Sequence, residues 1–401
     1  MAVKQIPSSE VEIGMYISHL DRPWVETPFL FQGFEVQSQE DIDELCEHTK
    51  YVYVMVPDEE IEVGGLSSHQ AASIETSELI HKTSYSETVS AEAEVKKIRS
   101  SHEELSALFT EIESLVQSGG TLRLEVLEQP VKYMVDSVAK NPDAYLWLTR
   151  LKKFDSFLYK DAVTSAVLAT ALGRQLGMAA QELQALAMGC MLMDIGKLSL
   201  PTELLHKPDR LDHDEWELMK THVDRGLELL KACPKCSPAV LDIVRTHHER
   251  LDGGGYPQGL QGSEIPLFGQ IAGIVDQYVA VTSPRPFAKP ISPSKAEEML
   301  YKQRGTMFDE ILVEYFIRTL STYPTGSLVE LSTGEVAIVK AQKSGLNLKP
   351  DVILLLDPNK QPYGTYTLAS LDNYTKDNLP VTIVKTLADG DHGVSIEELS
   401  L

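Results

Sequence analysis

The apolar residues of this chain recur with two periods, a helical one through the middle and a strand-like one towards both ends. Spacing of three or four residues places apolar side chains on one helix face, whereas alternation indicates a strand. Helical spacing is clear from 122 to 140 and from about 144 to 323. Within the second range we expect helices at 156–176, 180–193, 212–232, 238–250 and 265–282, and a final pair at 294–301 and 309–320.

Strand signals mark a small unit at each end. Near the start, apolar residues over 11–17 precede a helical stretch at 38–48 and a β-branched, aromatic run at 51–54, which predicts an α+β unit. Beyond 324, alternation predicts a hairpin over 327–339 and strands at 351–356 and 381–384. The expected organisation is an N-terminal α+β domain at 1–56, a linker at 57–101, a helical region at 102–323, a β-rich appendage at 324–386 and an acidic tail at 387–401.

Composition and charge narrow the function classes. A formal net charge of −23 would repel DNA, because protein affinity for DNA depends largely on neutralised phosphates. No apolar run approaches the roughly 20 residues that cross a bilayer, and the first residues lack the apolar core of a secretory signal. We therefore expect a cytoplasmic protein without a membrane span. Cys233 and Cys236 form a Cys-Pro-Lys-Cys motif for which a reduced loop, a zinc site and a redox pair all stay open.

Several polar residues interrupt the apolar faces of the predicted helices. Asp276 lies in an otherwise apolar helix, where an unpaired carboxylate would be costly. His247 and His248 are neighbours, so their side chains point about 100° apart and cannot share one exposed face. Imidazoles and carboxylates are ligands for divalent metals, and helical bundles bring such ligands together from separate helices. The candidates on separate helices are Asp194, His222, His247 with His248, and Asp276.

The stretch 246–257, Thr-His-His-Glu-Arg-Leu-Asp-Gly-Gly-Gly-Tyr-Pro, resembles the signature of the HD-GYP family, a branch of the metal-dependent HD phosphohydrolases. The resemblance implies cyclic di-GMP, a bacterial second messenger, as substrate. The segment 20–24, Leu-Asp-Arg-Pro-Trp, is similar to a small domain of unknown role that often precedes HD-GYP domains. The expected fold class is mainly α, an HD-type helical bundle with a small N-terminal α+β domain and a small C-terminal β appendage.

The resemblance also implies roles for individual residues. Met-Asp-Ile-Gly-Lys at 193–197 is similar to the family's His-Asp-Ile-Gly-Lys element, which makes Asp194 a bridging carboxylate and Lys197 a phosphate-facing base, both catalytic. The implied metal ligands, for Fe, Mn or Mg, are Asp194, His222, His247, His248, Asp276 and Asp161. The implied substrate-binding residues are Lys197, Arg285, Tyr256 and Lys289.

The sequence departs from the family pattern at four positions. Met193 replaces the histidine of the His-Asp pair, and a thioether is a poor ligand for hard cations. Asp161 stands where a ligand histidine is expected, Val279 where an aspartate is usual, and Ala288 where a basic residue is usual. We therefore expect one well-formed metal position and a second, weakened one. The first consists of Asp194, His222 and His247, with His248 as a further candidate; the second consists of Asp161, Met193, Asp194 and Asp276.

Two main functions follow from these residues. Two neighbouring metal ions can supply an activated water and neutralise the charge of a phosphodiester, which favours metal-dependent hydrolysis of cyclic di-GMP at a partly degraded site. The alternative is a catalytically inactive HD-GYP protein that senses a ligand or binds a protein, for example a diguanylate cyclase domain, through the Gly-Tyr-Pro region. A third possibility is hydrolysis of another phosphoester or nucleotide.

Overall fold

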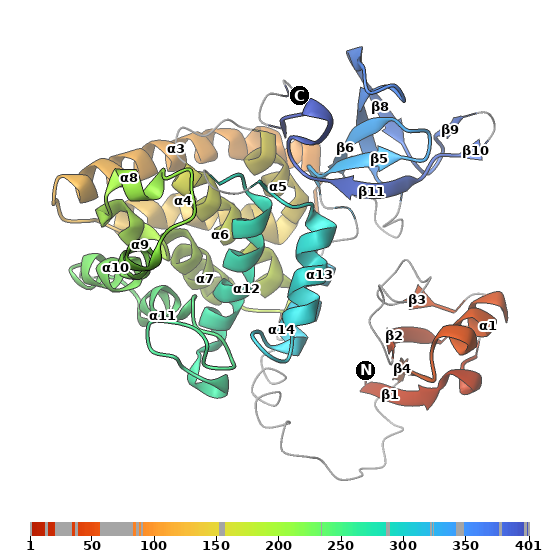
Figure 1. Ribbon diagram of the computed structural model, residues 1–401, viewed down its shortest axis with the longest axis horizontal. Coiled ribbons are helices and arrows are strands. Elements are labelled where there is room, and N and C mark those ends of the chain that lie inside the picture. The colour runs from red at the N-terminus through yellow and green to blue at the C-terminus, as the bar shows by residue number, and fades with distance from the viewer. Residues whose placement is uncertain are drawn as a thin grey trace. The chain divides into compact units, whose positions relative to one another are not determined.

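The structure is a computed structural model that describes residues 2–12, 15–20, 34–36, 39–56, 83–85, 88–89, 91–151, 157–233, 235–285, 289–320, 323, 325–341, 349–376, 379–396 and 399. It divides into two compact units, Met1–Gln70 and Ala71–Leu401, and each is described by itself. The predicted fold class is confirmed. The chain is mainly α, with a small α+β unit at the start and an antiparallel sheet near the end (Figure 1).

The N-terminal unit is a four-stranded sheet with one helix. Its strands lie in the order β1-β4-β2-β3, and the described core contains Ile17, Leu45 and Val52, all fully buried. Ile17 and Val52 belong to strands β2 and β4, and Leu45 of helix α1 packs with them in the same apolar cluster. The aromatic part of segment 20–24 lies outside the described residues. The element bounds are β1 Ala2–Pro7, β2 Tyr16–Leu20, β3 Phe34–Glu35, α1 Gln39–His48 and β4 Tyr51–Val56.

The second unit is built around a helical bundle in which α7 is central. Helix α7 packs against α4, α6 and α11, and its C-terminal half is almost wholly buried. Gly189 of α7 faces Ile243 so closely that an added Cβ would lie 2.2 Å from the Ile243 Cδ1. The long helices are α3 Ala91–Gln117, α4 Glu125–Lys140, α5 Pro142–Leu151, α6 Phe157–Gln175, α7 Ala180–Leu192, α10 His222–Lys231, α11 Pro238–Thr246, α12 Leu267–Thr282, α13 Pro293–Gln303 and α14 Glu310–Leu320.

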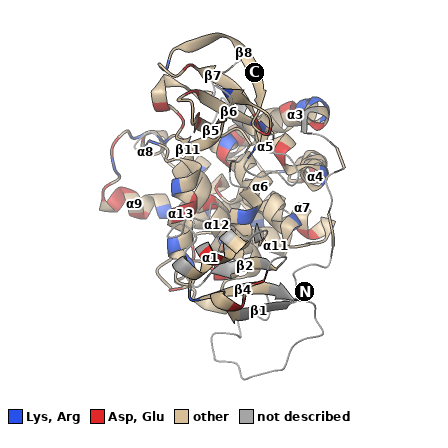
Figure 2. Cartoon of the chain, turned by 90° about the vertical axis from the view of Figure 1, so that its right-hand side faces the viewer, with Lys and Arg blue, Asp and Glu red and all other residues tan. Residues whose placement is uncertain are grey.

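The surface of the bundle carries charges of both signs. Figure 2 shows acidic and basic positions together along α3, where Lys97 and Glu94 form an ion pair at 3.8 Å. Helix α12, by contrast, has Asp276 as its only charged residue. This contrast is expected when α3 lies at the surface and α12 contributes to the core.

The prediction of one helix at 212–232 is wrong, because the structure has two helices in this range. Helix α9, His213–Lys220, and α10 are separated at Thr221. The Thr221 hydroxyl donates to the Leu218 carbonyl at 2.7 Å, and the Thr221 amide donates to the same oxygen at 3.2 Å. These bonds tighten the turn and interrupt the α-helical pattern. As a result, His222 begins a new helix.

The C-terminal sheet has five antiparallel strands in the order β11-β5-β6-β7-β8, and β5 and β6 form the predicted hairpin. The segment expected to be an acidic tail contains two anchored residues, Val394 and Ile396, which are buried against Leu328 and Val336. Apolar burial explains why this acidic stretch packs. The bounds are β5 Leu328–Leu331, β6 Val336–Ala341, β7 Asp351–Leu356, β8 Pro362–Ser370, β9 Thr375–Lys376, β10 Leu379–Pro380 and β11 Ile383–Leu387.

No helix within the described ranges has the length and apolar character needed to span a membrane.

Glu297 of α13 makes the stability of the second unit depend on pH. Its Oε1 atom is buried without a hydrogen-bond partner, and burial raises the pKa of Glu297 to about 8. Since this pKa lies above that of the unfolded chain, the unfolded state ionises first, and stability falls from about the ordinary pKa up to pH 8. We predict that Glu297→Gln raises the unfolding temperature clearly at pH 9 and little at pH 5.

The matched control is Glu298→Gln. Glu298 is paired with Lys302, and that hydrogen bond lowers the pKa of Glu298. This variant should therefore not be stabilised at pH 9. The unfolding temperatures are measured by circular dichroism during heating. If Glu297→Gln changed the unfolding temperature equally at pH 5 and pH 9, the prediction would be contradicted.

Candidate metal centre

Four predicted ligands converge at one point of the helical bundle. Asp194 follows α7 and precedes the short 3-10 helix η4, Ile195–Ser199; His222 begins α10; and His247 and His248 follow α11. One ligand atom from each of the four lies within 4.8 Å of the corresponding atom of every other. Among the residues that the structure describes, this is the only group of three or more His, Cys, Asp or Glu side chains whose ligand atoms are close enough together to hold a metal ion. The predicted first metal position contains the same four residues.

Two glycines allow the segments that carry these ligands to approach closely. At Gly196, an added Cβ would lie 1.9 Å from the backbone oxygen of His222, so η4 can contact α10 only with glycine here. At Gly273 of α12, an added Cβ would lie 2.9 Å from the backbone oxygen of His247. These contacts fix the backbone at both histidines, and the ligand positions therefore depend on glycine.

The hydrogen bonds of His222 and His247 determine which ring nitrogens are available. Nδ1 of His222 lies 2.8 Å from the Met219 carbonyl oxygen, and Nδ1 of His247 lies 3.0 Å from the Val244 carbonyl oxygen. A carbonyl oxygen only accepts, so each Nδ1 carries the hydrogen. In a neutral ring, Nε2 then carries a lone pair that can bind a metal. Both lone pairs therefore point away from the backbone.

The free nitrogens face each other and a carboxylate. Nε2 of His222 lies 3.4 Å from Nε2 of His247, and the Asp194 Oδ1 lies 3.2 Å and 3.8 Å from these two atoms. Asp194 Oδ1 and the Nε2 of His248 are buried without a hydrogen-bond partner. Several acceptors that face one another without a donor are unfavourable unless a cation lies between them. The residues present therefore fit a divalent metal.

Protonation states agree with this arrangement. Burial lowers the pKa of His222, although the Asp194 carboxylate opposes the shift, and burial together with the neighbouring His247 and His222 holds the pKa of His248 well below its usual value. Burial raises the pKa of Asp194, but Lys197 and the two histidines outweigh it, and that pKa lies well below the ordinary one. Neutral imidazoles and an ionised carboxylate are the forms that bind metal.

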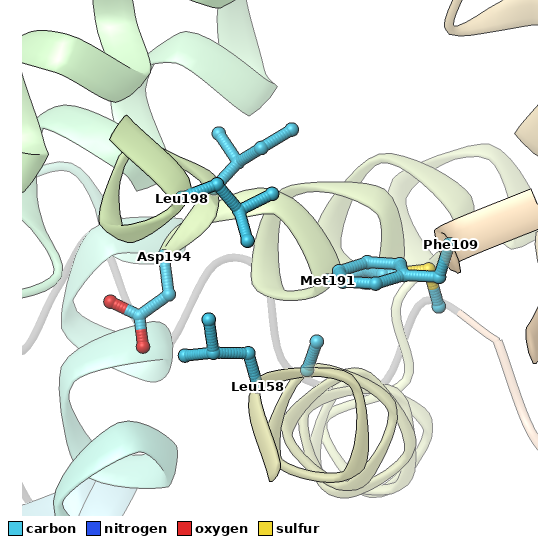
Figure 3. Close-up of a pocket in the computed structure, with 7 residues that line it drawn as sticks. Phe109, Leu158, Met191, Asp194 and Leu198 are labelled. Carbon is cyan, nitrogen blue, oxygen red and sulfur yellow. The ribbon is translucent and has the colours of Figure 1, made fainter. Parts of the chain in front are cut away.

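Lys197 is held against the same carboxylate. Its Nζ lies 2.7 Å from the Asp194 Oδ2, so one oxygen of Asp194 is paired with lysine while the other faces the histidines. Figure 3 shows Asp194 at one end of a small pocket, with Phe109 and Met191 at the far end and Leu158 and Leu198 between them. Apart from Asp194 the lining is apolar. Such a wall strengthens the attraction between the carboxylate and any cation.

The Gly-Tyr-Pro stretch closes over His248. The Tyr256 ring stacks on the His248 ring with centroids 4.6 Å apart. Gly255 permits this return of the chain, because an added Cβ would lie 2.5 Å from the Arg250 amide nitrogen. The Glu249 carboxylate accepts hydrogen bonds from the backbone amides of Gln258 and Leu260, at 2.7 Å and 3.0 Å. The conformation of the loop is therefore tied to the histidine pair.

Three residues at the site have contacts that the sequence did not reveal. Arg250 donates to the backbone oxygen of His247 at 2.9 Å and lies over the Phe308 ring. Trp216 is 45% exposed, and the centroid of its ring lies 6.0 Å from that of the Tyr256 ring. The Lys220 Nζ lies 5.8 Å from the centroid of the same tyrosine ring. A large aromatic residue among the charged residues of the first turns of α9 was the available signal for Trp216.

The other predicted site residues are not part of this group. Asp276 Oδ2 is 3.6 Å from the His248 Nδ1, and Asp161 Oδ2 is 2.9 Å from the Arg285 Nη2. Met193 is buried, with 2% of its surface exposed, and Lys289 is exposed. Ala288 lies outside the described residues. The ligand roles of Asp161 and Asp276 and the ligand-binding roles of Arg285, Tyr256 and Lys289 stay predictions.

Comparison with known proteins agrees with the geometry. Residues 149–312 match a family model described as an HD domain, and residues 3–126 match one described as a domain of unknown function, DUF3391. The chain is similar to the Cyclic di-GMP phosphodiesterase PA4108 of Pseudomonas aeruginosa, with 29% identity over 87% of this chain and 84% of that protein.

Two further matches cover a smaller part of the chain. The 3'3'-cGAMP-specific phosphodiesterase 2 of Vibrio cholerae is 37% identical over 35% of this chain and 27% of that protein. The Cyclic di-GMP phosphodiesterase response regulator RpfG of Xanthomonas campestris is 37% identical over 40% of this chain and 44% of that protein. The chain thus spans most of the Pseudomonas protein and less than half of the other two.

Removal of metal should destabilise the bundle. We predict that Mn²⁺ raises the unfolding temperature of protein treated with EDTA, since a ligand that binds only the folded state adds about 2.7 kcal/mol at roughly 100 times its Kd. His247→Ala should lose this metal-dependent increase, whereas His213→Ala, at the exposed start of α9, should keep it. The measurement is thermal unfolding with and without Mn²⁺. An equal increase in both variants would contradict the assignment.

Proposed function

Because the chain belongs to the HD-GYP family, we propose that it is a cyclic di-GMP signalling protein that hydrolyses a phosphodiester bond of this dinucleotide with the help of a divalent metal. The observation that carries the proposal is the convergence of Asp194, His222, His247 and His248. Two of the relatives named above are called cyclic di-GMP phosphodiesterases, and the longer of these matches covers 87% of this chain. The metal would be Fe, Mn or Mg.

In this proposal the four clustered residues hold the metal and Lys197 faces the phosphate. When bound, the ion supplies charge neutralisation and makes a water molecule more acidic. Lys197 has three N–H donors, of which one is directed to Asp194, so the others can donate to a phosphoryl oxygen. Its half-buried ammonium group stays close to the site because Asp194 retains it.

Arg285, Tyr256 and Lys289 are proposed to bind the rest of the dinucleotide. Arg285 uses one terminal nitrogen on Asp161, which leaves N–H groups for a guanine or phosphate oxygen. Tyr256 presents an aromatic ring beside His248, and Lys289 contributes an exposed positive charge. Local cations of this kind would offset the negative charge of the whole chain at the site.

A second candidate function is ligand sensing or protein binding without turnover. Two observations favour it. Met193 replaces a family histidine and is buried, and Asp161 is paired with Arg285. A partner, for example a diguanylate cyclase domain, would bind at the Gly-Tyr-Pro region, where exposed Trp216 lies next to Tyr256. Exposed aromatic residues are common in protein interfaces.

Hydrolysis assays distinguish the two functions. We predict that purified protein with excess Mn²⁺ converts cyclic di-GMP and that Asp194→Ala loses this activity by at least about 100-fold, because metal and Lys197 both depend on that carboxylate. Asp242→Ala is the matched control, since Asp242 is partly exposed and pairs with Arg245. Hydrolysis of 3'3'-cGAMP is measured in the same way, because one of the relatives is named as specific for that dinucleotide. Binding of cyclic di-GMP without turnover in the unaltered protein would favour the sensor.

Met193→His tests whether the thioether limits catalysis. The imidazole would add a nitrogen ligand next to Asp194, and we expect turnover to rise by about 10-fold or more, which corresponds to roughly 1.4 kcal/mol in the activation barrier. Met193→Leu keeps the apolar volume and should give no rise. The readout is the initial rate with Mn²⁺. No gain in the histidine variant would mean that Met193 does not set the rate.

A further inference from the structure

Asp161 and Arg285 form an ion pair that is largely shielded from water. The Arg285 Nη2 lies 2.9 Å from the Asp161 Oδ2, and only 15% and 11% of the two side chains are exposed. The Ser283 side chain also opposes the rise that burial gives to the pKa of Asp161. Asp161 belongs to α6, whereas Ser283 and Arg285 follow the end of α12, so the pair joins two helices of the bundle. A buried ion pair of this kind holds each partner strongly, because removing one leaves an uncompensated charge.

The pair lies beside the metal-binding group. Ala162, which follows Asp161, lines the same small pocket as Asp194. The Asp161 carboxylate is also close enough to Asp194 and Lys197 for both charges to affect its pKa. Arg285 is thus a positive charge paired with Asp161 of α6, whereas the Asp194 Oδ1 faces the histidines.

From this position we infer that the Arg285 guanidinium is the resident cation of the second metal position and that the chain therefore holds a single divalent ion. The inference rests on the proposed metal-binding function. Three carboxylates, those of Asp161, Asp194 and Asp276, lie around the site, and each requires a counter-charge or a strong hydrogen bond in such surroundings. Lys197 supplies the counter-charge of Asp194 and Arg285 that of Asp161, while the Asp276 Oδ2 lies 3.6 Å from the His248 Nδ1. A second metal ion would have to displace the guanidinium.

Two further features make that displacement unfavourable. A divalent ion at Asp161 would meet the positive charge of Arg285. The ion would also lack a nitrogen ligand on that side, because Met193 offers only a thioether, which binds hard cations weakly. The same arginine side chain therefore satisfies Asp161 without a metal, and it stays anchored with donors left for an anionic ligand.

The test is the number of Mn²⁺ ions bound per chain, measured by elemental analysis after equilibrium dialysis and by electron paramagnetic resonance, which distinguishes isolated from coupled Mn²⁺. We expect one isolated ion in the unaltered chain and in Asp161→Asn, with Kd values within about 2-fold of each other. We expect Arg285→Gln to acquire a second, weaker ion, because its Asp161 carboxylate is released. Arg285→Gln combined with Asp161→Asn should return to one ion.

Arg245→Gln is the matched control, since Arg245 also pairs with an aspartate but lies partly exposed on α11, and it should bind one ion. Two coupled ions in the unaltered chain, or one ion in Arg285→Gln at saturating Mn²⁺, would overturn the inference. If Arg285→Gln fails to fold, Asp161→Asn decides, and a loss of affinity of about 10-fold or more would show that Asp161 is a metal ligand. No bound Mn²⁺ in any form would instead contradict the proposed metal site itself.

Discussion

His222 and His247 each donate from Nδ1 to a backbone carbonyl, and this pair of hydrogen bonds is the constraint on which the site depends. Because both Nδ1 hydrogens are used in these bonds, the two Nε2 atoms present lone pairs to each other at 3.4 Å. The Asp194 Oδ1 lies beside them. The repulsion of these acceptors must be offset by a cation. Gly196 and Gly273 allow the helices to approach closely enough for this geometry, so packing and metal chemistry are set by the same contacts.

The charge around Asp194 is divided between its two oxygens. Oδ2 is neutralised by Lys197, while Oδ1 remains available on the histidine side. On the α6 side, Asp161 is neutralised by Arg285. In the arrangement that we propose, the chain keeps the ligands of one metal position and has an arginine where the other would need a metal. This division is compatible with slow hydrolysis and with ligand binding alone, which is why both functions are proposed from one geometry.

Much of the site could be predicted from the sequence, because each ligand lies at or just beyond the end of a helix that the apolar pattern locates. Asp194, His222, His247 and His248 meet as expected, since their positions follow from helix order and from the resemblance of their motifs. The pairing of Asp161 with Arg285 could not be predicted, because it depends on how the end of α12 returns over α6, and sequence spacing does not record such a contact.

The fold shows the same division between local and tertiary causes. Periodicity located the main helices and the C-terminal hairpin, but it extended the helix at 238–250 beyond its end at Thr246 and missed the break at Thr221. The Thr221 hydroxyl donates a hydrogen bond to the Leu218 carbonyl and breaks the helix there, although the apolar pattern of the sequence continues through the break. The packing of Val394 and Ile396 was missed for a related reason, since two apolar residues within an acidic stretch give too weak a signal.

The central claim is that Asp194, His222, His247 and His248 bind one divalent cation and that no second ion lies at Asp161. It is tested most directly by a crystal structure of Mn²⁺-loaded protein with anomalous scattering recorded at the manganese edge. We expect one anomalous peak between Asp194 Oδ1 and the two Nε2 atoms, with Arg285 still paired to Asp161. A peak between Asp161 and Asp276, or the absence of any peak at the histidines, would contradict it.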